Sequence, residues 1–305
     1  MNLSGCYSLE NKENLYQVLK PASASTHRTF GQDITNLILR PHDSDKIDSQ
    51  DPQRLGYYAH EIFAYLHKVE NNFQANFGYL KAQFEINESM RSILIDWVIE
   101  VHLKFKLMPE TLFLTVNIID RFCEAAIVSR HNYQLLAISA LLIACKYEEI
   151  TVPDIKSLSF ISDHTYSQKE ILAMEGSILR ALHFNVTVTT PFRFLERYAR
   201  LIHMDNLAFN LAHYTIELSL MDYKMLKYSP SQIAASSIYL TNKLYNNDSA
   251  WPQILIEESP YNDTDLRACA KELCLNLQGS RQSPFQALFK KFSLPRFCEV
   301  AKMVF

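Results

Sequence analysis

Hydrophobic residues recur with the period of an α-helix from Asp51 almost to the C-terminus. The segment 90–102, "MRSILIDWVIEVH", shows the pattern at its densest. At 100° per residue, Ile95 and Ile99 lie nearly opposite a second apolar side, which is made of Met90, Ile93, Leu94, Trp97 and Val101. One side can enter a core, and the other then needs a second partner.

Four further stretches predict helices by the same criterion. Residues 51–70 place Pro52 at a first-turn position, and residues 109–126 begin with Pro109. Residues 132–149 are apolar almost all round, which predicts a central, buried helix. Residues 167–184 open with Ser167 and Glu170, the spacing of a capping box.

Strand signals are few. Only short stretches such as "FNVTVTT", residues 184–190, have strand character, and Pro191 ends that one. The chain has only six glycines in 305 residues, so tight hairpin turns are scarce. The sequence therefore predicts an all-α fold.

A long-period repeat predicts two domains. The stretch "QLLAISALLIACKY" from Gln134 aligns with "QIAASSIYLTNKLY" from Gln232, 98 residues later. This period is too long for a solenoid and suits a duplicated helical domain.

The composition is that of an ordinary globular protein with a polar N-terminal tail. Hydrophobic residues make up 48% of the chain, and residues 1–50 are polar, so we expect a disordered tail there. The net charge of −3 argues against nucleic acid as the main ligand. The six cysteines show no CxxC pair or zinc spacing, which indicates buried free thiols. Without a signal-type segment or a long apolar run, we expect a soluble protein of the nucleus and cytoplasm, with no membrane partner.

Catalytic motifs do not emerge from the sequence. The glycines are too scattered for a phosphate-binding loop, and no GxSxG, HExxH or aspartate-rich motif occurs. We expect neither an enzyme nor a cofactor or metal site. Four charged residues do interrupt apolar helices, and burial of such charges requires pairing; they are Arg91, Asp120, Lys146 and Glu175.

The segments 90–123, 133–150 and 166–184 together resemble the cyclin box, and most closely that of mitotic B-type cyclins. The likeness extends over about five sixths of the chain. It implies two tandem five-helix domains, at 51–187 with a leading docking helix and at 188–305, that follow the tail of residues 1–50. It also implies a regulatory subunit that binds and activates a cyclin-dependent protein kinase at the G2/M transition.

The resemblance assigns roles to the internal charges. Arg91 and Asp120 match a structural ion pair between the first two helices of the box. Lys146 and Glu175 match the pair at the kinase interface. The edges of that contact would comprise Tyr147, Glu148, Glu149, Leu179, Phe184 and Val186, with Tyr58 and Ile62 from the leading helix.

The second side of the segment 90–102 corresponds to a substrate-docking patch in cyclins. The resemblance implies that it receives Arg-x-Leu motifs of substrates or inhibitors. The leucine would enter the apolar part, and the arginine would meet Glu100. The patch consists of Met90, Ile93, Leu94, Trp97, Glu100 and Gln134.

The tail carries two candidate degradation signals for a mitotic ubiquitin ligase. Lys12, Glu13 and Asn14 spell a KEN box. The stretch "RTFGQDITN" resembles a destruction box, with Gly31 in place of the usual apolar residue; the matching positions are Arg28, Asp33, Ile34 and Asn36.

Two other readings remain open. An A-type cyclin acting in S and G2 has similar box motifs, although the short tail and the Ser-Leu-Met-Asp-Tyr run favour the B-type. A transcription-factor-like double cyclin fold would need a basic surface facing DNA and would not need Lys146 together with Glu175.

Overall fold

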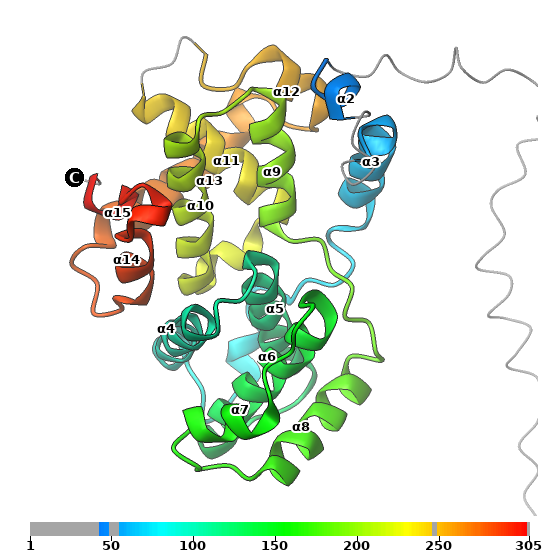
Figure 1. The fold of residues 1–305 in the computed structure, drawn as a ribbon, viewed down its shortest axis with the longest axis vertical. Coiled ribbons are helices and arrows are strands. Elements are labelled where there is room, and N and C mark those ends of the chain that lie inside the picture. Colours follow the sequence, from blue (N-terminus) through cyan, green and yellow to red (C-terminus); the bar gives the residue numbers. More distant parts are fainter. Residues whose placement is uncertain (1–42, 49–54, 246–248, 304–305) are drawn as a thin grey trace, which may run out of the picture. The chain divides into compact units, whose positions relative to one another are not determined.

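The computed structural model describes residues 43–48, 55–245 and 249–303, and these residues form helices without a strand. The first elements are α2 (Asp43–Asp48), η2 (Gly56–Tyr58), α3 (Ala59–Val69) and η3 (Tyr79–Ala82). Figure 1 shows α3 running beside α9, although the whole first helical bundle lies between them in sequence.

The first bundle comprises five α-helices and the short turn η4 (Arg130–Asn132). They are α4 (Glu88–Phe105), α5 (Pro109–Ala125), α6 (Tyr133–Glu148), α7 (Ile155–Ile161) and α8 (Gln168–Ala181). Every residue of α6 from Leu135 to Cys145 is buried, which confirms the central helix expected at 132–149.

The second bundle repeats the order of the first. It comprises α9 (Pro191–Leu201), α10 (Asn206–Met221), η5 (Tyr223–Lys227), α11 (Pro230–Leu244), α12 (Gln253–Glu258) and α13 (Asp263–Gly279). Three short elements follow, α14 (Ala287–Phe292), η6 (Pro295–Phe297) and α15 (Val300–Met303). The two sets of five α-helices confirm the all-α, tandem architecture.

The two central helices are fixed in a related way. Ser139 on α6 donates its hydroxyl to the carbonyl oxygen of Ile171 on α8, over 3.1 Å. Ser236 on α11 donates to the carbonyl oxygen of Leu266 on α13, over 3.4 Å. In each bundle a small buried side chain lets the central and fifth helices approach closely, and its hydroxyl still finds an acceptor.

Local sequence explains where these helices begin. Asn87 caps α4 by accepting from the Met90 amide, and Pro109 occupies the first turn of α5. Ser167 and Glu170 form the expected capping box of α8.

The leading helix α3 packs on the second bundle. Phe63 on α3 lies 6.0 Å from Phe194 on α9, measured between ring centroids. Glu70, at the end of α3, accepts from the backbone amide and the hydroxyl of Ser231, both at 2.8 Å. Glu70 therefore satisfies an orphan amide in the first turn of α11.

The structure differs from the sequence expectations at three places. Residues 184–190 form no strand, and Phe184 has a φ of 60° that does not suit one. The helix expected from residue 51 begins only at Ala59, after the 3-10 turn η2. Residues 43–48, which were expected to belong to a disordered tail, form α2. In the described part of the chain, no helix is long and apolar enough to span a membrane.

Candidate functional site

Arg91 on α4 and Asp120 on α5 form a buried, bidentate ion pair. The Arg91 Nε and Nη2 atoms donate to Asp120 Oδ1 and Oδ2, each over 2.7 Å. Tyr79 donates its hydroxyl to Asp120 Oδ1 over 2.6 Å. Burial lowers the Arg91 pKa, but the adjacent Asp120 charge outweighs it and holds the pKa above its ordinary value.

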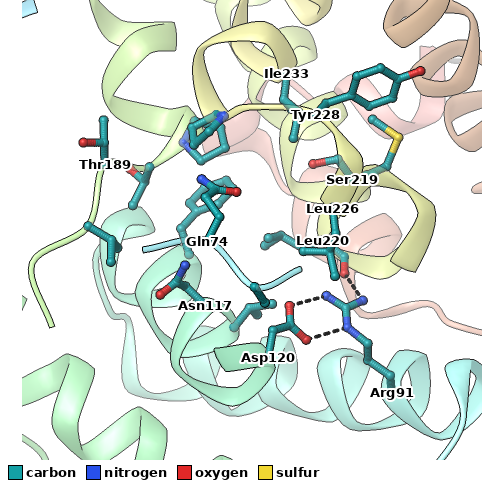
Figure 2. Close-up of a pocket in the computed structure, with 18 residues that line it drawn as sticks. Gln74, Arg91, Asn117, Asp120, Thr189, Ser219, Leu220, Leu226, Tyr228 and Ile233 are labelled. Carbon is teal, nitrogen blue, oxygen red and sulfur yellow. Dashed lines mark hydrogen bonds and ion pairs between the residues drawn. The ribbon is translucent and has the colours of Figure 1, made fainter. Parts of the chain in front are cut away.

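The same arginine also reaches the second bundle. Arg91 Nη1 donates to the carbonyl oxygen of Leu220 over 2.9 Å (Figure 2). Ser92 donates its hydroxyl to the carbonyl oxygen of Met221 over 3.0 Å. Both carbonyls belong to the last turn of α10, where helical partners are lacking and a positive charge is favourable. The sequence predicted a pair within one bundle, whereas the structure shows a connection between two.

A small cavity adjoins this junction. Its volume is about 70 Å³, and its walls come from Gln74 and Ala75 after α3, from Arg91 on α4, from α5, from residues 188–190 and from the second bundle. Figure 2 shows Asn117, Gln74 and Thr189 on one side of it and Ser219 with Leu226 on the other. The cavity separates the bundles near Arg91 without exposing the ion pair, since both side chains are only 2% accessible.

Lys146 and Glu175 form the second expected pair, at the surface. Lys146 Nζ, at the end of α6, donates to Glu175 Oε1 on α8 over 2.6 Å. The Lys146 side chain is 48% exposed and the Glu175 side chain 12%. The pair thus lies at an accessible edge of the first bundle.

Of the residues expected around Lys146, some are exposed and others are half-buried. Tyr147 is exposed, and its hydroxyl lies 2.6 Å from the Thr187 hydroxyl in the segment after α8. Phe184 is 67% exposed in that segment, whereas Leu179 and Val186 are half-buried against the core. These side chains extend an apolar surface beside the ion pair.

Glu149 and the leading helix α3 contact other parts of the fold than the Lys146–Glu175 pair. Glu149 accepts from the Met108 amide over 2.7 Å and from the Thr111 hydroxyl over 2.5 Å, so it serves the start of α5, while Glu148 is exposed. Tyr58 is exposed in η2, and Ile62 is half-buried on α3, which packs on the second bundle. The structure does not join Tyr58 to the Lys146–Glu175 pair by any hydrogen bond within the described residues.

The predicted docking patch lies along α4. Trp97 and Met90 are half-buried against the core, and Ile93 is 55% exposed. Leu94 is buried, so it forms the floor of the patch rather than its surface. Ile95 and Ile99, on the opposite side, are fully buried and fill the core.

The two polar residues at the rim of the predicted patch differ in exposure. Glu100 is exposed and lies 3.7 Å from Lys290 on α14, measured from carboxylate oxygen to ammonium nitrogen. Both side chains are more than half exposed, and such pairs are weak. Gln134, at the start of α6, is half-buried.

Two charged clusters were missed by sequence reasoning. Lys291 on α14 donates to both oxygens of Glu217 on α10, over 2.6 and 2.7 Å, with both side chains buried. In the second cluster, Arg197 on α9 binds Asp45 of α2 and also donates to Glu258 over 2.9 Å. Partners more than 60 residues apart leave no periodic signal in the sequence.

Some expected features lie outside what the structure describes. The degron residues Lys12, Glu13, Asn14, Arg28, Asp33, Ile34 and Asn36 all fall outside the described residues, as does Cys6. The other five cysteines are free. The described part of the chain contains no cluster of three His, Cys, Asp or Glu side chains able to hold a metal ion.

Family models match both bundles. The model of the cyclin N-terminal domain covers residues 61–187, and that of the cyclin C-terminal domain covers residues 189–305.

Several characterised proteins are similar over most of the chain. The G2/mitotic-specific cyclin-B of Marthasterias glacialis is 37% identical over 87% of this chain and 68% of its own length. G2/mitotic-specific cyclin-1 of Medicago sativa subsp. varia is 39% identical over 85% of this chain and 61% of its own length. A G2/mitotic-specific cyclin-B of Dictyostelium discoideum is 38% identical over 88% of this chain, which again spans 61% of the relative.

Solved structures share the fold at lower identity. A viral cyclin from herpesvirus saimiri superposes with a TM-score of 0.63 at 19% identity, over 70% of this chain and 97% of its own. A chain of the yeast RNA polymerase II CTD kinase CTDK-1 complex gives a TM-score of 0.55 at 13% identity, over 75% of this chain and 80% of its own.

Proposed function

This chain belongs to the cyclin family, and on that premise we propose that it is a B-type cyclin that binds and activates a cyclin-dependent protein kinase at the G2/M transition. It acts as a non-catalytic regulatory subunit. Three of the relatives that cover most of the chain, from Medicago sativa, Marthasterias glacialis and Dictyostelium discoideum, are G2/mitotic-specific cyclins, which supports this assignment.

The proposed mechanism is a shift in the conformational equilibrium of the kinase. A protein kinase is active only when its αC glutamate pairs with the catalytic lysine and its activation loop is ordered. A rigid helical surface that binds only this arrangement favours it by its differential affinity. The two packed bundles supply such a surface and need supply no catalytic group.

The observation that carries the proposal is the geometry of Lys146 and Glu175. One Lys146 proton and one Glu175 oxygen are used in their mutual hydrogen bond. An ammonium has three protons and a carboxylate has two oxygens, so each group keeps capacity for a partner. The exposed ring of Phe184 and the half-buried Val186 lie in the segment next to this pair and offer apolar area for the same partner.

The test is reconstitution with a cyclin-dependent kinase identified by co-purification and mass spectrometry. We expect Lys146→Ala and Glu175→Ala to abolish activation of histone phosphorylation by the complex. The matched control is Lys271→Ala, since Lys271 is an exposed lysine on α13. Unchanged kinase activity with either Lys146→Ala or Glu175→Ala would refute the proposed interface.

The α4 surface supports a second part of the proposal, docking of Arg-x-Leu peptides. Ile93 and Trp97 offer accessible apolar area above the buried Leu94. A peptide leucine buried there would contribute about 1.5–3 kcal/mol, which suits a transient contact. Its arginine would replace Lys290 as the partner of Glu100.

The tail supports the third part, degradation through the mitotic ubiquitin ligase. The KEN sequence at 12–14 and the degenerate destruction box at 28–36 carry it. We expect deletion of residues 1–40 to prolong the lifetime of the protein through mitotic exit, measured by a translation shut-off chase. Unchanged turnover would exclude both signals.

A further inference from the structure

A second groove lies between the end of α4 and α7. Its volume is about 430 Å³, and its walls include Lys104, Phe105, Lys156, Phe160, Ile161 and His164. Phe160 is 61% exposed, so its ring presents accessible apolar area to the groove. The groove thus offers an aromatic surface rimmed by basic side chains.

This groove continues the docking patch on the same face of α4. Trp97, Glu100 and Lys104 follow one another at spacings of three and four residues, so their side chains lie in one row along the helix. Phe105 and Ile161 pack against the same apolar cluster as Trp97. A peptide that follows the row beyond Glu100 therefore enters the groove.

The charges of the groove are all of one sign. Lys104 Nζ lies 5.9 Å from the centroid of the Phe160 ring, and Lys156 is exposed. Neither lysine forms an ion pair with another described residue, and no acidic side chain lines the groove. The sign contrasts with the chain as a whole, whose net charge is −3.

We propose that this groove is a specificity subsite for acidic residues that precede the Arg-x-Leu motif, with an apolar or aromatic residue between them. The inference rests on the proposed docking at Trp97. With leucine at Trp97 and arginine at Glu100, the peptide runs toward Lys104 in its N-terminal direction. Lys104 lies about 6 Å beyond Glu100 along the helix. An extended peptide advances about 3.3 Å per residue, so acidic residues two to four positions before the arginine reach Lys104 and Lys156.

The test compares three fluorescent peptides with the same Arg-x-Leu core by polarisation, using the full chain. Their upstream flanks occupy the fourth to second positions before the arginine and are Glu-Phe-Glu, Gln-Phe-Gln and Lys-Phe-Lys. We expect the acidic flank to bind about fivefold more tightly than the neutral one at low salt, and the basic flank to bind most weakly. High salt should remove the difference, because the cations are exposed.

Charge-reversed variants locate the effect. The double variant Lys104→Glu/Lys156→Glu should reverse the order of the acidic and basic peptides and leave the neutral peptide within about twofold. The double variant Lys81→Glu/Lys271→Glu carries the same change in net charge at exposed lysines elsewhere and should keep the original order.

The outcomes separate this inference from the docking proposal. Equal binding of the acidic and neutral peptides to the native chain, or the same order with Lys104→Glu/Lys156→Glu, would overturn the subsite while the docking patch stands. If none of the three peptides binds the native chain more tightly than it binds Trp97→Ala, the docking patch fails, and the subsite fails with it.

Discussion

Arg91 bridges Asp120 in its own bundle and the Leu220 carbonyl in the next, within 2.9 Å of each acceptor. The guanidinium is buried, so it cannot exchange these partners for water. Burial of the Arg91 charge beside the last turn of α10 therefore depends on the counter-charge of Asp120. This pair couples the integrity of one bundle to the packing of both.

Removal of Asp120 alone should be strongly destabilising. Asp120→Ala leaves a buried guanidinium without a counter-charge, and we expect a loss of about 3–5 kcal/mol in the free energy of unfolding. Denaturant unfolding followed by circular dichroism measures it. Arg193→Ala is the control, because its pair with Glu196 is exposed, and it should cost under about 1 kcal/mol.

A double variant sharpens this prediction. Arg91→Met/Asp120→Leu removes both charges together, so we expect it to be more stable than Asp120→Ala. A double variant as unstable as Asp120→Ala would show that the connections to Tyr79 and Leu220, rather than charge balance, dominate.

The Lys146–Glu175 pair, unlike the Arg91–Asp120 pair, should contribute little to the stability of the fold. The Lys146 side chain is 48% exposed, and solvent screens its charge. We expect Lys146→Ala to lower the free energy of unfolding by under about 1 kcal/mol, a change of a few degrees at most in the melting temperature. Differential scanning fluorimetry measures it. A large loss of stability would mean that lost kinase activation in this variant reflects unfolding.

The helices of the first bundle follow from local signals in the sequence. Helical period, Pro109 and the Ser167–Glu170 capping box fix the helices of the first bundle, because each acts within one or two turns. Resemblance to cyclins supplied the pairing of Arg91 with Asp120, which lie on different helices. Neither source indicated Leu220, since a backbone carbonyl carries no side-chain signature.

The remaining differences arise from tertiary contacts. Residues 43–48 are as polar as the rest of the tail, yet Arg200 binds Asp48 through two hydrogen bonds and holds this segment on α9. The pairing of Glu217 with Lys291 and the groove beside Phe160 likewise depend on how distant helices meet. Amino-acid composition and hydrophobic periodicity do not predict such tertiary contacts.

Trp97→Ala should weaken peptide docking without disturbing kinase activation. Loss of the indole removes most of the apolar contact that a peptide leucine would make, so we expect at least about a tenfold weaker affinity for an Arg-x-Leu peptide. Fluorescence polarisation measures it. Leu275→Ala serves as the control, because Leu275 is 58% exposed on α13, in the other bundle. Equal affinities of Trp97→Ala and the native chain would exclude the docking patch.

His102 makes the stability of the protein depend on pH. Its side chain is buried on α4, and its Nε2 lies 2.8 Å from the Met108 carbonyl oxygen. Burial, reinforced by the nearby Lys291 charge, lowers the His102 pKa from 6.5 to about 4. The unfolded chain therefore takes up a proton at a higher pH than the folded chain does. Stability is full above about pH 6.5 and falls as the pH drops toward 4, by up to about 3 kcal/mol.

The comparison of His102→Gln with the native chain isolates this contribution. Glutamine can still donate to the Met108 carbonyl oxygen but does not titrate. The free energy of unfolding of His102→Gln should therefore fall less steeply between pH 6.5 and pH 4 than that of the native chain. His131→Gln, at an exposed histidine in η4, should follow the native curve. Below about pH 4.5 both variants should lose further stability, because the Glu217 pKa is lowered to about 2. Burial acts to raise this pKa, and the charges of Lys291 and His213 outweigh the effect of burial. Parallel curves for His102→Gln and the native chain between pH 6.5 and pH 4 would show that the buried imidazole is not the titrating group.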